Sequence, residues 1–304
     1  MWNCCDAGAA RLFKESERHF VFEMTFPMYV VRYADVLRMT AVQAHQRLMA
    51  DGVLVEFDCQ SGVAVFVSHH RASRQHPDPT GEQFGVLQEV LRRVIGGTLR
   101  IETDTFFQLL GSETVAQVNG SDLMALGDVS FIWYDFFAVP QLQARTDSDE
   151  DTDLNSDMGK AVMSIPAYIE RSRFFIILAP EVEHADVPGL IIGYSSWKTR
   201  GWCRLERVAR VLAPGSSHML LAKHGDVLHE VAVRDHWFDP VGEAKFSFDA
   251  DREKVLPIVE EMFARKCGDL RRDGLLQAYR LLKSSESQMR RGLPVVTRME
   301  GGGG

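Results

Sequence analysis

The stretch Val63-Ala64-Val65-Phe66-Val67 decides the fold, because an unbroken apolar run rich in β-branched residues is typical of a strand buried on both faces. Two later runs have the same character, Val129-Ser130-Phe131-Ile132-Trp133-Tyr134 and Phe174-Phe175-Ile176-Ile177-Leu178. Strands of this kind occur in parallel sheets that carry helices on both faces. We therefore expect the three runs to lie side by side and parallel.

Helical periodicity separates the three runs. Apolar residues recur at intervals of three and four over residues 84–94 and 158–169, which predicts helices in both ranges. Gly96-Gly97 is expected to end the first helix. Pro166 is expected to break the second, so that Ser164 caps a further short helix.

Strands that alternate with helices predict an α/β fold with a doubly wound parallel sheet. We assign residues 61–236 to this α/β domain, with Met219-Leu220-Leu221 as its fourth strand. Residues 1–60 are expected to form an N-terminal extension with a helix and a strand. Residues 237–304 are expected to form a C-terminal helical segment that ends in a flexible tail.

The composition excludes several classes of protein. Of the 304 residues, 45% are hydrophobic and 25% are charged, which indicates a folded chain rather than a disordered one. The 34 Lys and Arg residues against 42 Asp and Glu give a net charge of −8, so no nucleic-acid partner is expected. No apolar run approaches the roughly 20 residues that cross a bilayer, so no transmembrane segment is expected.

The cysteines indicate a reducing compartment. The chain has 5 of them, an odd number without a C-x-x-C pair, which disfavours both a disulfide framework and a zinc site. We therefore expect a cytoplasmic location. The adjacent Cys4 and Cys5 leave acylation of the N-terminus open as an alternative.

The segment from Asp147 to Asp157 is strongly acidic and, apart from Leu154, has hardly any apolar side chain to bury. A segment of this composition gains too little from burial to offset the entropy lost on ordering. We expect a disordered, removable loop that proteases cut first.

Signatures of several enzyme classes are missing. The chain contains no G-x-G-x-x-G, Walker A, G-x-S-x-G or H-E-x-x-H motif, which disfavours dehydrogenases, NTPases, serine hydrolases and zinc peptidases. His69, His70 and His76 lack the carboxylate or thiolate partners typical of a metal site. Hydrogen bonding within a loop is the favoured role for these histidines.

In an open parallel sheet, the ligand crevice lies beyond the carboxyl ends of the strands, where the strand order reverses. The residues that follow the three buried runs are therefore candidates: Ser68 to Arg71, Asp135 to Gln141 and Pro180 to His184. The segment from Tyr194 to Glu206, Y-S-S-W-K-T-R-G-W-C-R-L-E, adds two tryptophans, a thiol and a carboxylate at the start of a further predicted helix.

At these positions the sequence resembles the Toll/interleukin-1 receptor (TIR) domain family, over about residues 62–235. The motifs that carry the resemblance are Phe66-Val67-Ser68, Asp135, Ile169 to Ser172, and above all Ser196 followed by Trp202-Cys203-x-x-Glu206. The chain also resembles uncharacterised proteins of unicellular eukaryotes in a series of ordered blocks. These blocks are F-V-S-H at Phe66 to His69, H-P-D-P at His76 to Pro79, Y-D-x-x-x-x-P-Q at Tyr134 to Gln141, S-I-P-A-Y at Ser164 to Tyr168 and G-W-C-R-x-E at Gly201 to Glu206.

The resemblance implies a flavodoxin-like sheet and one of two functions. Some TIR domains cleave the glycosidic bond of NAD with the glutamate of the W-C-x-x-E block, which is Glu206 here, whereas others only self-associate and recruit partners. NAD would be a nucleotide substrate rather than a cofactor, and neither a cofactor nor a metal is implied. Glu206 is therefore the candidate catalytic residue. The candidate substrate-binding residues are Ser68, His69, Arg71, Asp135, Trp202 and Cys203.

A carboxylate suits this cleavage because loss of nicotinamide builds positive charge on the ribose. We expect Glu206 to face the segment from Ser68 to Arg71, since it lies one turn beyond Trp202. Replacement of Glu206 by Gln is expected to abolish NAD cleavage and to leave stability nearly unchanged. The second expectation assumes a surface carboxylate, whose pairing with a neighbouring arginine contributes at most about 1 kcal/mol.

Most of the candidate site residues also have an alternative role outside NAD cleavage. Glu206 can be an exposed helix residue paired with Arg210, Trp202 can be a core anchor, and Cys203 can be a small buried apolar residue. Asp135 can be the phosphate acceptor of a receiver-like domain, although the acidic cluster and lysine of such a site are not evident. The two main functions remain an NAD-cleaving enzyme and a non-catalytic module for signalling or assembly.

The sequence departs from the TIR pattern in three loops. The gap between the first two strands is long, an acidic insertion follows the second strand, and Trp197 to Gly201 separate Ser196 from Trp202, where many members have one residue or none. Each of these loops would shape the site or the assembly surface.

Overall fold

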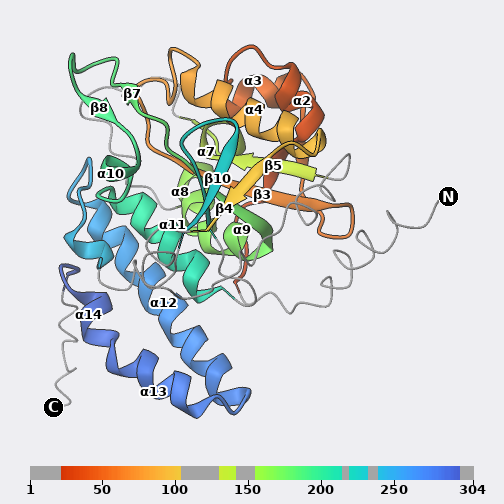
Figure 1. Cartoon of the computed structure of the whole chain (residues 1–304). Coiled ribbons are helices and arrows are strands. Elements are labelled where there is room, and N and C mark those ends of the chain that lie inside the picture. The colour runs from red at the N-terminus through yellow and green to blue at the C-terminus, as the bar shows by residue number, and fades with distance from the viewer. Residues whose placement is uncertain (1–21, 104–129, 142–154, 214–218, 232–238, 295–304) are drawn as a thin grey trace, which may run out of the picture.

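The three buried runs lie side by side at the centre of one eight-stranded sheet (Figure 1). The computed structural model describes residues 22–103, 130–141, 155–213, 219–231 and 239–294. The strands are β1 (Tyr29–Arg32), β2 (Leu54–Glu56), β3 (Val63–His69), β4 (Arg100–Glu102), β5 (Ser130–Tyr134), β6 (Ser172–Leu178), β9 (Met219–Ala222) and β10 (Val227–Val231), in the spatial order β2-β1-β5-β3-β6-β9-β10-β4.

The central strands are parallel, as the apolar runs predict. Strand β3 pairs in parallel with β5, placing Val65 opposite Ile132, and with β6, placing Phe66 opposite Phe175. Strand β6 pairs in parallel with β9. From β3 the chain passes through α4 to β4 at the far edge of the sheet, beside β10. The next two central strands, β5 and β6, lie on opposite sides of β3, so the strand order reverses at β3. The fold is therefore a flavodoxin-like, doubly wound α/β fold with its switch point at the carboxyl end of β3.

Toward both edges of the sheet, some neighbouring strands are antiparallel rather than parallel. Strand β1 runs antiparallel to both β5 and β2, and β10 runs antiparallel to β9. Strand β1 was not expected from the sequence. Residues 29–56, assigned above to an N-terminal extension, thus continue the sheet of the α/β domain, and they cover the edge that β5 would otherwise expose.

Helices cover the two faces of the sheet (Figure 1). Helix α4 packs on β6 and β9 and against α2, whereas α9 packs on β3 and β6 on the opposite face, beside α11. The helices are α2 (Tyr33–Arg38), α3 (His45–Ala50), α4 (Glu82–Ile95), α7 (Asp135–Ala138), α8 (Asp157–Met163), α9 (Ile165–Arg171), α10 (Tyr194–Trp197), α11 (Gly201–Leu212), α12 (Asp251–Arg272), α13 (Leu276–Ser284) and α14 (Glu286–Arg290). A hairpin of β7 (Val182–Glu183) and β8 (Ile191–Ile192) and a 3₁₀ turn, η4 (Val241–Glu243), complete the elements.

Two predicted helix boundaries are found in the structure. Helix α4 ends at Ile95, and Gly97 follows with the left-handed φ of 64° that favours glycine. Helices α8 and α9 meet at Ser164, as Pro166 indicated. The Ser164 hydroxyl does not cap α9, however, because it bonds to the Lys160 carbonyl and the Thr25 N–H instead.

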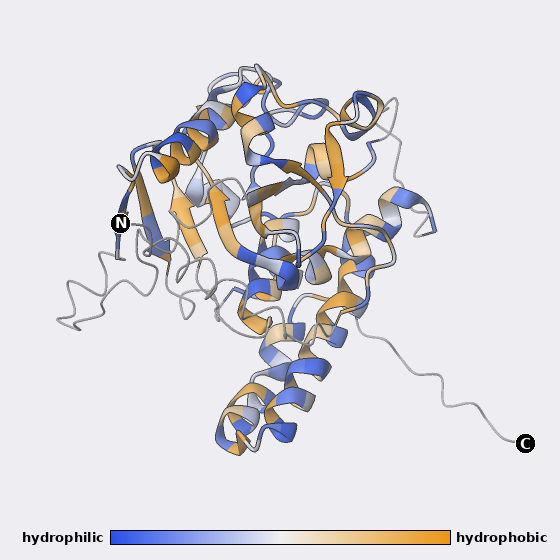
Figure 2. Cartoon of the chain, turned by 90° about the vertical axis from the view of Figure 1, so that its right-hand side faces the viewer, coloured by the Kyte–Doolittle hydropathy of each residue, from blue (hydrophilic) through white to orange (hydrophobic). Residues whose placement is uncertain are grey.

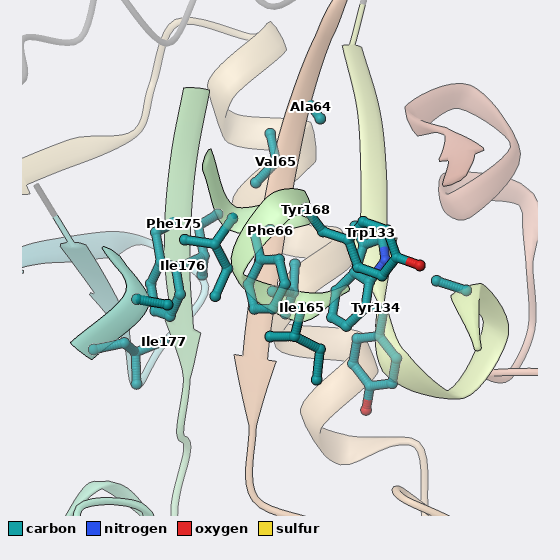
Figure 3. Close-up of a cluster of buried hydrophobic side chains, with 14 of the residues drawn as sticks. Ala64, Val65, Phe66, Trp133, Tyr134, Ile165, Tyr168, Phe175, Ile176 and Ile177 are labelled. Atoms are coloured by element: carbon teal, nitrogen blue, oxygen red, sulfur yellow. The ribbon is translucent and has the colours of Figure 1, made fainter. Parts of the chain in front are cut away.

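The core is built on stacked aromatic rings. Phe66 of β3 lies between Trp133 of β5, with ring centroids 4.2 Å apart, and Phe175 of β6, with centroids 5.2 Å apart. Tyr168 of α9 closes this layer against Trp133, so four elements share one cluster (Figure 3). Trp133 is fully buried, as expected. The strands that carry these side chains are hydrophobic along their length, whereas the helices present mixed surfaces (Figure 2).

The C-terminal segment is helical, as expected, and α12 to α14 extend away from the sheet (Figures 1 and 2). Helix α12 packs on α11, and its Val255, Ile258, Val259 and Met262 are buried in the core. Most of the expected acidic loop, up to residue 154, lies outside the described residues.

In the parts of the chain that are described, none of the helices combines the length and apolar character needed to span a membrane.

We predict that replacing Phe66 with Ala destabilises the fold by about 3–5 kcal/mol, because the cavity left between two stacked rings cannot collapse. Urea denaturation followed by tryptophan fluorescence measures the loss. Phe248→Ala is the matched control, because Phe248 is 39% exposed and its truncation is expected to cost less than about 1 kcal/mol. Equal losses in the two variants would contradict the central role of this ring.

Candidate functional site

Strand β3 and helices α10 and α11 bring Ser68, Trp197 and Glu206 together, and we call these three residues the carboxyl cluster. The Ser68 hydroxyl donates to Glu206 Oε2 at 2.5 Å, and the Trp197 indole Nε1–H donates to Ser68 Oγ at 2.9 Å. All three side chains are buried. The expectation that Glu206 faces the end of β3 is therefore confirmed.

The Glu206 carboxyl is held in a poorly solvated place. The pKa of Glu206 is raised to about 8, mainly by burial. The hydrogen bond from Ser68 opposes this rise, and the negative charge of Asp135 adds to it. Glu206 keeps 9% of its surface exposed. At neutral pH the carboxyl of the free protein is therefore mostly protonated.

Asp135, directly after β5, is the second carboxyl of the site and behaves in the opposite way. His69 Nε2 lies 2.8 Å from its Oδ1, and an Arg71 guanidinium nitrogen lies 4.0 Å from its Oδ2. Burial alone would raise the pKa of Asp135, but the interactions with His69, Arg71 and the Phe136 N–H outweigh it and lower the pKa to about 2. The side chain is 36% exposed, so the site holds an ionised carboxylate that reaches solvent.

The His69 ring is fixed by more than its carboxylate. It stacks on Tyr134 with ring centroids 4.2 Å apart, and its side chain is only 2% exposed. Arg71 lies against the ring of Phe136, 5.6 Å from its centroid. The end of β3 and the start of α7 thus form one packed polar group at the carboxyl edge of the sheet.

Helix α10 places Trp197 through Ser196. The Ser196 hydroxyl lies 2.9 Å from His70 Nδ1, and it also hydrogen-bonds to the N–H and the carbonyl of Gly193. Burial lowers the pKa of His70 to about 3, and the charge of Arg200 adds to the effect, so this histidine is neutral. No role for Trp197 was expected from the sequence. A signal was present, because Trp197 is the one large apolar residue in the polar stretch from Ser195 to Arg200.

Cys203 is a buried thiol beside the cluster. Its Sγ approaches the His69 carbonyl at 3.4 Å, and burial raises the pKa of the thiol well above its usual value. It behaves as the small buried residue that was the alternative to a reactive group.

Trp202 packs against the core where α11 meets the C-terminal helix α12. It is only partly buried, and its indole N–H donates to Asp251 Oδ2 of α12 at 2.9 Å. Its ring meets Phe246 edge to face. Trp202 therefore holds the C-terminal helix onto α11, and the fully buried tryptophan of this segment is Trp197.

The proposed surface pair of Glu206 and Arg210 is wrong, because both residues are buried. Arg210 donates to the carbonyl oxygens of Ser172 and Arg173 at the start of β6. Arg207, on the same helix, is fully buried and reaches Asp239 Oδ2 at 3.2 Å. An apolar face alone does not predict this burial, because α11 is enclosed by the sheet, α9 and α12 together.

His69, His70 and His76 all make hydrogen bonds, but to partners in other segments rather than only within their own loop: Asp135, Ser196 and the Val42 carbonyl. His69 thus has a carboxylate partner, Asp135, which the sequence did not indicate. His76 Nε2 lies 3.0 Å from the Val42 carbonyl. Within the described ranges, no group of three or more His, Cys, Asp or Glu side chains is arranged to hold a metal ion.

Comparisons of the chain with models of protein families, with curated proteins and with solved structures find no match. The function of the site is therefore argued from its geometry.

The burial of Glu206 changes what a substitution there does to stability. The pKa of Glu206 is about 8 in the folded protein and 4.5 for an ordinary glutamate. The protonated side chain therefore contributes fully to the free energy of unfolding below pH 4.5, and this contribution is lost as the pH rises through 8. Because Gln does not titrate, only the wild type loses stability as the pH rises. The free energy of unfolding of Glu206→Gln minus that of wild type should therefore increase from pH 5 to pH 8 by on the order of 3–5 kcal/mol. Urea denaturation at several pH values measures this difference.

Glu261→Gln is the control for this prediction, because Glu261 is a half-exposed carboxylate on α12 that pairs with Arg265. Its stability should follow the wild-type curve across the pH range. A constant difference between wild type and Glu206→Gln from pH 5 to 8 would contradict the assignment.

Proposed function

We propose that the chain is a TIR-like enzyme that hydrolyses the N-glycosidic bond of NAD, with Glu206 as the key carboxylate. The observation that carries the proposal is the position of this carboxyl. It lies at the carboxyl end of β3, where the strand order reverses, and Ser68 hydrogen-bonds to it at 2.5 Å. The W-C-x-x-E block and the F-V-S block, far apart in the sequence, thus meet in one site.

The chemistry of the bond explains the need for a buried carboxylate. As nicotinamide leaves, positive charge develops on the ribose ring, and a fixed carboxylate that accepts hydrogen bonds from the ribose hydroxyls stabilises that charge. The low dielectric around Glu206 strengthens this interaction. Ser68 and Trp197 hold the carboxyl in one orientation, so little reorganisation is needed during the reaction.

The group at Asp135 complements Glu206. Asp135 is ionised and partly exposed, so it adds negative charge at the edge where the cationic nicotinamide ring would approach. The Arg71 guanidinium, 23% exposed beside it, suits the pyrophosphate of a dinucleotide. Both residues keep the substrate-binding role that the resemblance implies.

The alternative function is a non-catalytic module for self-association or partner recruitment. One observation favours it: the hairpin of β7 and β8 exposes Val187, Leu190 and Ile191 close together in the sequence. Exposed apolar side chains that lie together are typical of interaction surfaces. Both functions are compatible, because assembly can bring several catalytic sites together.

We predict that the purified protein converts NAD to nicotinamide and that Glu206→Gln lowers the rate at least a hundredfold. The amide keeps the size of the side chain but carries no charge. Chromatographic separation of the products, at high protein concentration, measures the reaction. The wild-type rate should rise with pH up to about 8, because the ionised carboxylate is the active form.

Glu261→Gln should cleave NAD as wild type does. If a folded Glu206→Gln variant cleaves NAD equally well, the catalytic role of Glu206 is wrong. If wild type does not cleave NAD at any pH or concentration, the proposed NAD-cleaving function is wrong.

A further inference from the structure

We propose a second activity for the same carboxyl: hydrolysis of neutral purine ribonucleosides, with Glu206 Oε1 donating a proton to the leaving base. This inference rests on the proposed function, because it uses the same site and the same type of bond. It differs from NAD cleavage in the protonation state of Glu206 and in the charge of the substrate.

The hydrogen bonds of the carboxyl cluster fix the direction of donation. Ser68 Oγ accepts the Trp197 N–H and donates its own proton to Glu206 Oε2. With Oε2 as the acceptor of this bond, the proton of the neutral carboxyl resides on Oε1. Within the described part of the chain, Ser68 is the one polar group that hydrogen-bonds to this carboxyl. Oε1 is therefore left for a ligand, and it is not among the fully buried, unpaired polar atoms of the described residues.

Nearby arginines are held by other partners and do not pair with the carboxyl. On α11 itself, Arg207 pairs with Asp239, and Arg204 donates to the Lys198 and Pro240 carbonyls. In the loop before α11, Arg200 donates to the Ser247 hydroxyl.

The remaining charged and titratable groups around α11 are also engaged. From β3 and β5, His69 and Asp135 pair with each other. From α12, Asp251 pairs with Lys254, and from α9, Glu170 accepts from the Phe22 N–H. A buried carboxyl without a cationic partner is more stable in its neutral, proton-carrying form.

The leaving group decides which form of Glu206 is useful. The nicotinamide of NAD is bound as a cation and leaves as a neutral molecule, so it needs no proton. The base of a nucleoside is bound in a neutral form and would leave as an anion, so a proton donor lowers the barrier. A purine has a basic ring nitrogen, N7, that can receive this proton.

The reaction balances with water alone. The bond between ribose C1′ and purine N9 breaks, and its electron pair goes to the base, which takes the proton of Glu206 Oε1 at N7. Water adds to C1′ and gives one proton to the carboxylate that has formed on Glu206. The products are the free base and ribose, and Glu206 regains its protonated form.

The test compares NAD, adenosine and uridine with the purified full chain from pH 6 to 9.5. Adenosine cleavage should be fastest below pH 8 and fall about tenfold per pH unit above it, opposite to the NAD profile. Uridine, which lacks a basic ring nitrogen, should be cleaved at least a hundredfold more slowly than adenosine. Release of free bases, separated by chromatography, is the measurement.

Substitutions of Glu206 and Ser68 test whether these two residues set the pH profile of adenosine cleavage. Glu206→Gln should lose adenosine cleavage, and Glu261→Gln should keep the wild-type profile. Ser68→Ala removes the hydrogen bond that favours the ionised form, so the pH at which adenosine cleavage declines should rise by about one to two units. An unchanged midpoint in a folded Ser68→Ala variant would contradict the role of Ser68 in setting the protonation of Glu206.

The outcomes separate this inference from the proposed function. Cleavage of NAD without cleavage of adenosine at any pH overturns the inference and leaves the proposed function standing. Cleavage of adenosine without NAD overturns the proposed substrate and supports the inference. Cleavage of neither substrate overturns both.

Discussion

The register of strand β3 is the constraint on which the site depends. Its seven residues are all buried, and its last two, Ser68 and His69, carry polar side chains that must find partners without water. Side chains alternate along a strand, so the two residues point to opposite faces of the sheet. Ser68 meets Glu206 and Trp197, and His69 meets Asp135. A slip of one residue would exchange these partners and would also turn Phe66 to the opposite face of the sheet, away from Trp133 and Phe175.

The two carboxyls of the site differ because their neighbours differ. Glu206 has a hydroxyl as its hydrogen-bond partner, so burial dominates and the neutral form is favoured. Asp135 has an imidazole and a guanidinium, so the charged form is favoured even though it is partly buried. Two carboxyls whose pKa values are driven in opposite directions suit a site that must both stabilise and transfer charge.

The segment between Ser196 and Trp202 gives this chain a feature of its own. Trp197, its first residue, fills the space beside the end of β3 and directs the Ser68 hydroxyl toward Glu206. Trp202 turns away to Asp251 and anchors the C-terminal helix. The two tryptophans thus have separate tasks, one in the carboxyl cluster and one in fixing α12 to the α/β body.

The sequence by itself determined the central sheet. The runs around Phe66, Ile132 and Phe175 are apolar throughout, and such strands are typical of a parallel sheet with helices on both faces. The sequence also brought Ser68 and Glu206 to one site, because strand ends and the start of the following helix share the carboxyl edge of such a sheet.

Tertiary structure alone decided how that site is built. Strand β1 forms because β5 offers it a free side of the sheet, and its own sequence pattern does not indicate it. The burial of Arg207 and Arg210 depends on three elements, the sheet, α9 and α12, that pack around α11. Which of the two indoles is fully buried, Trp197 rather than Trp202, also depends on the elements that pack around each of them. Composition and periodicity describe one segment at a time, whereas burial and protonation are set by every segment that packs against a side chain.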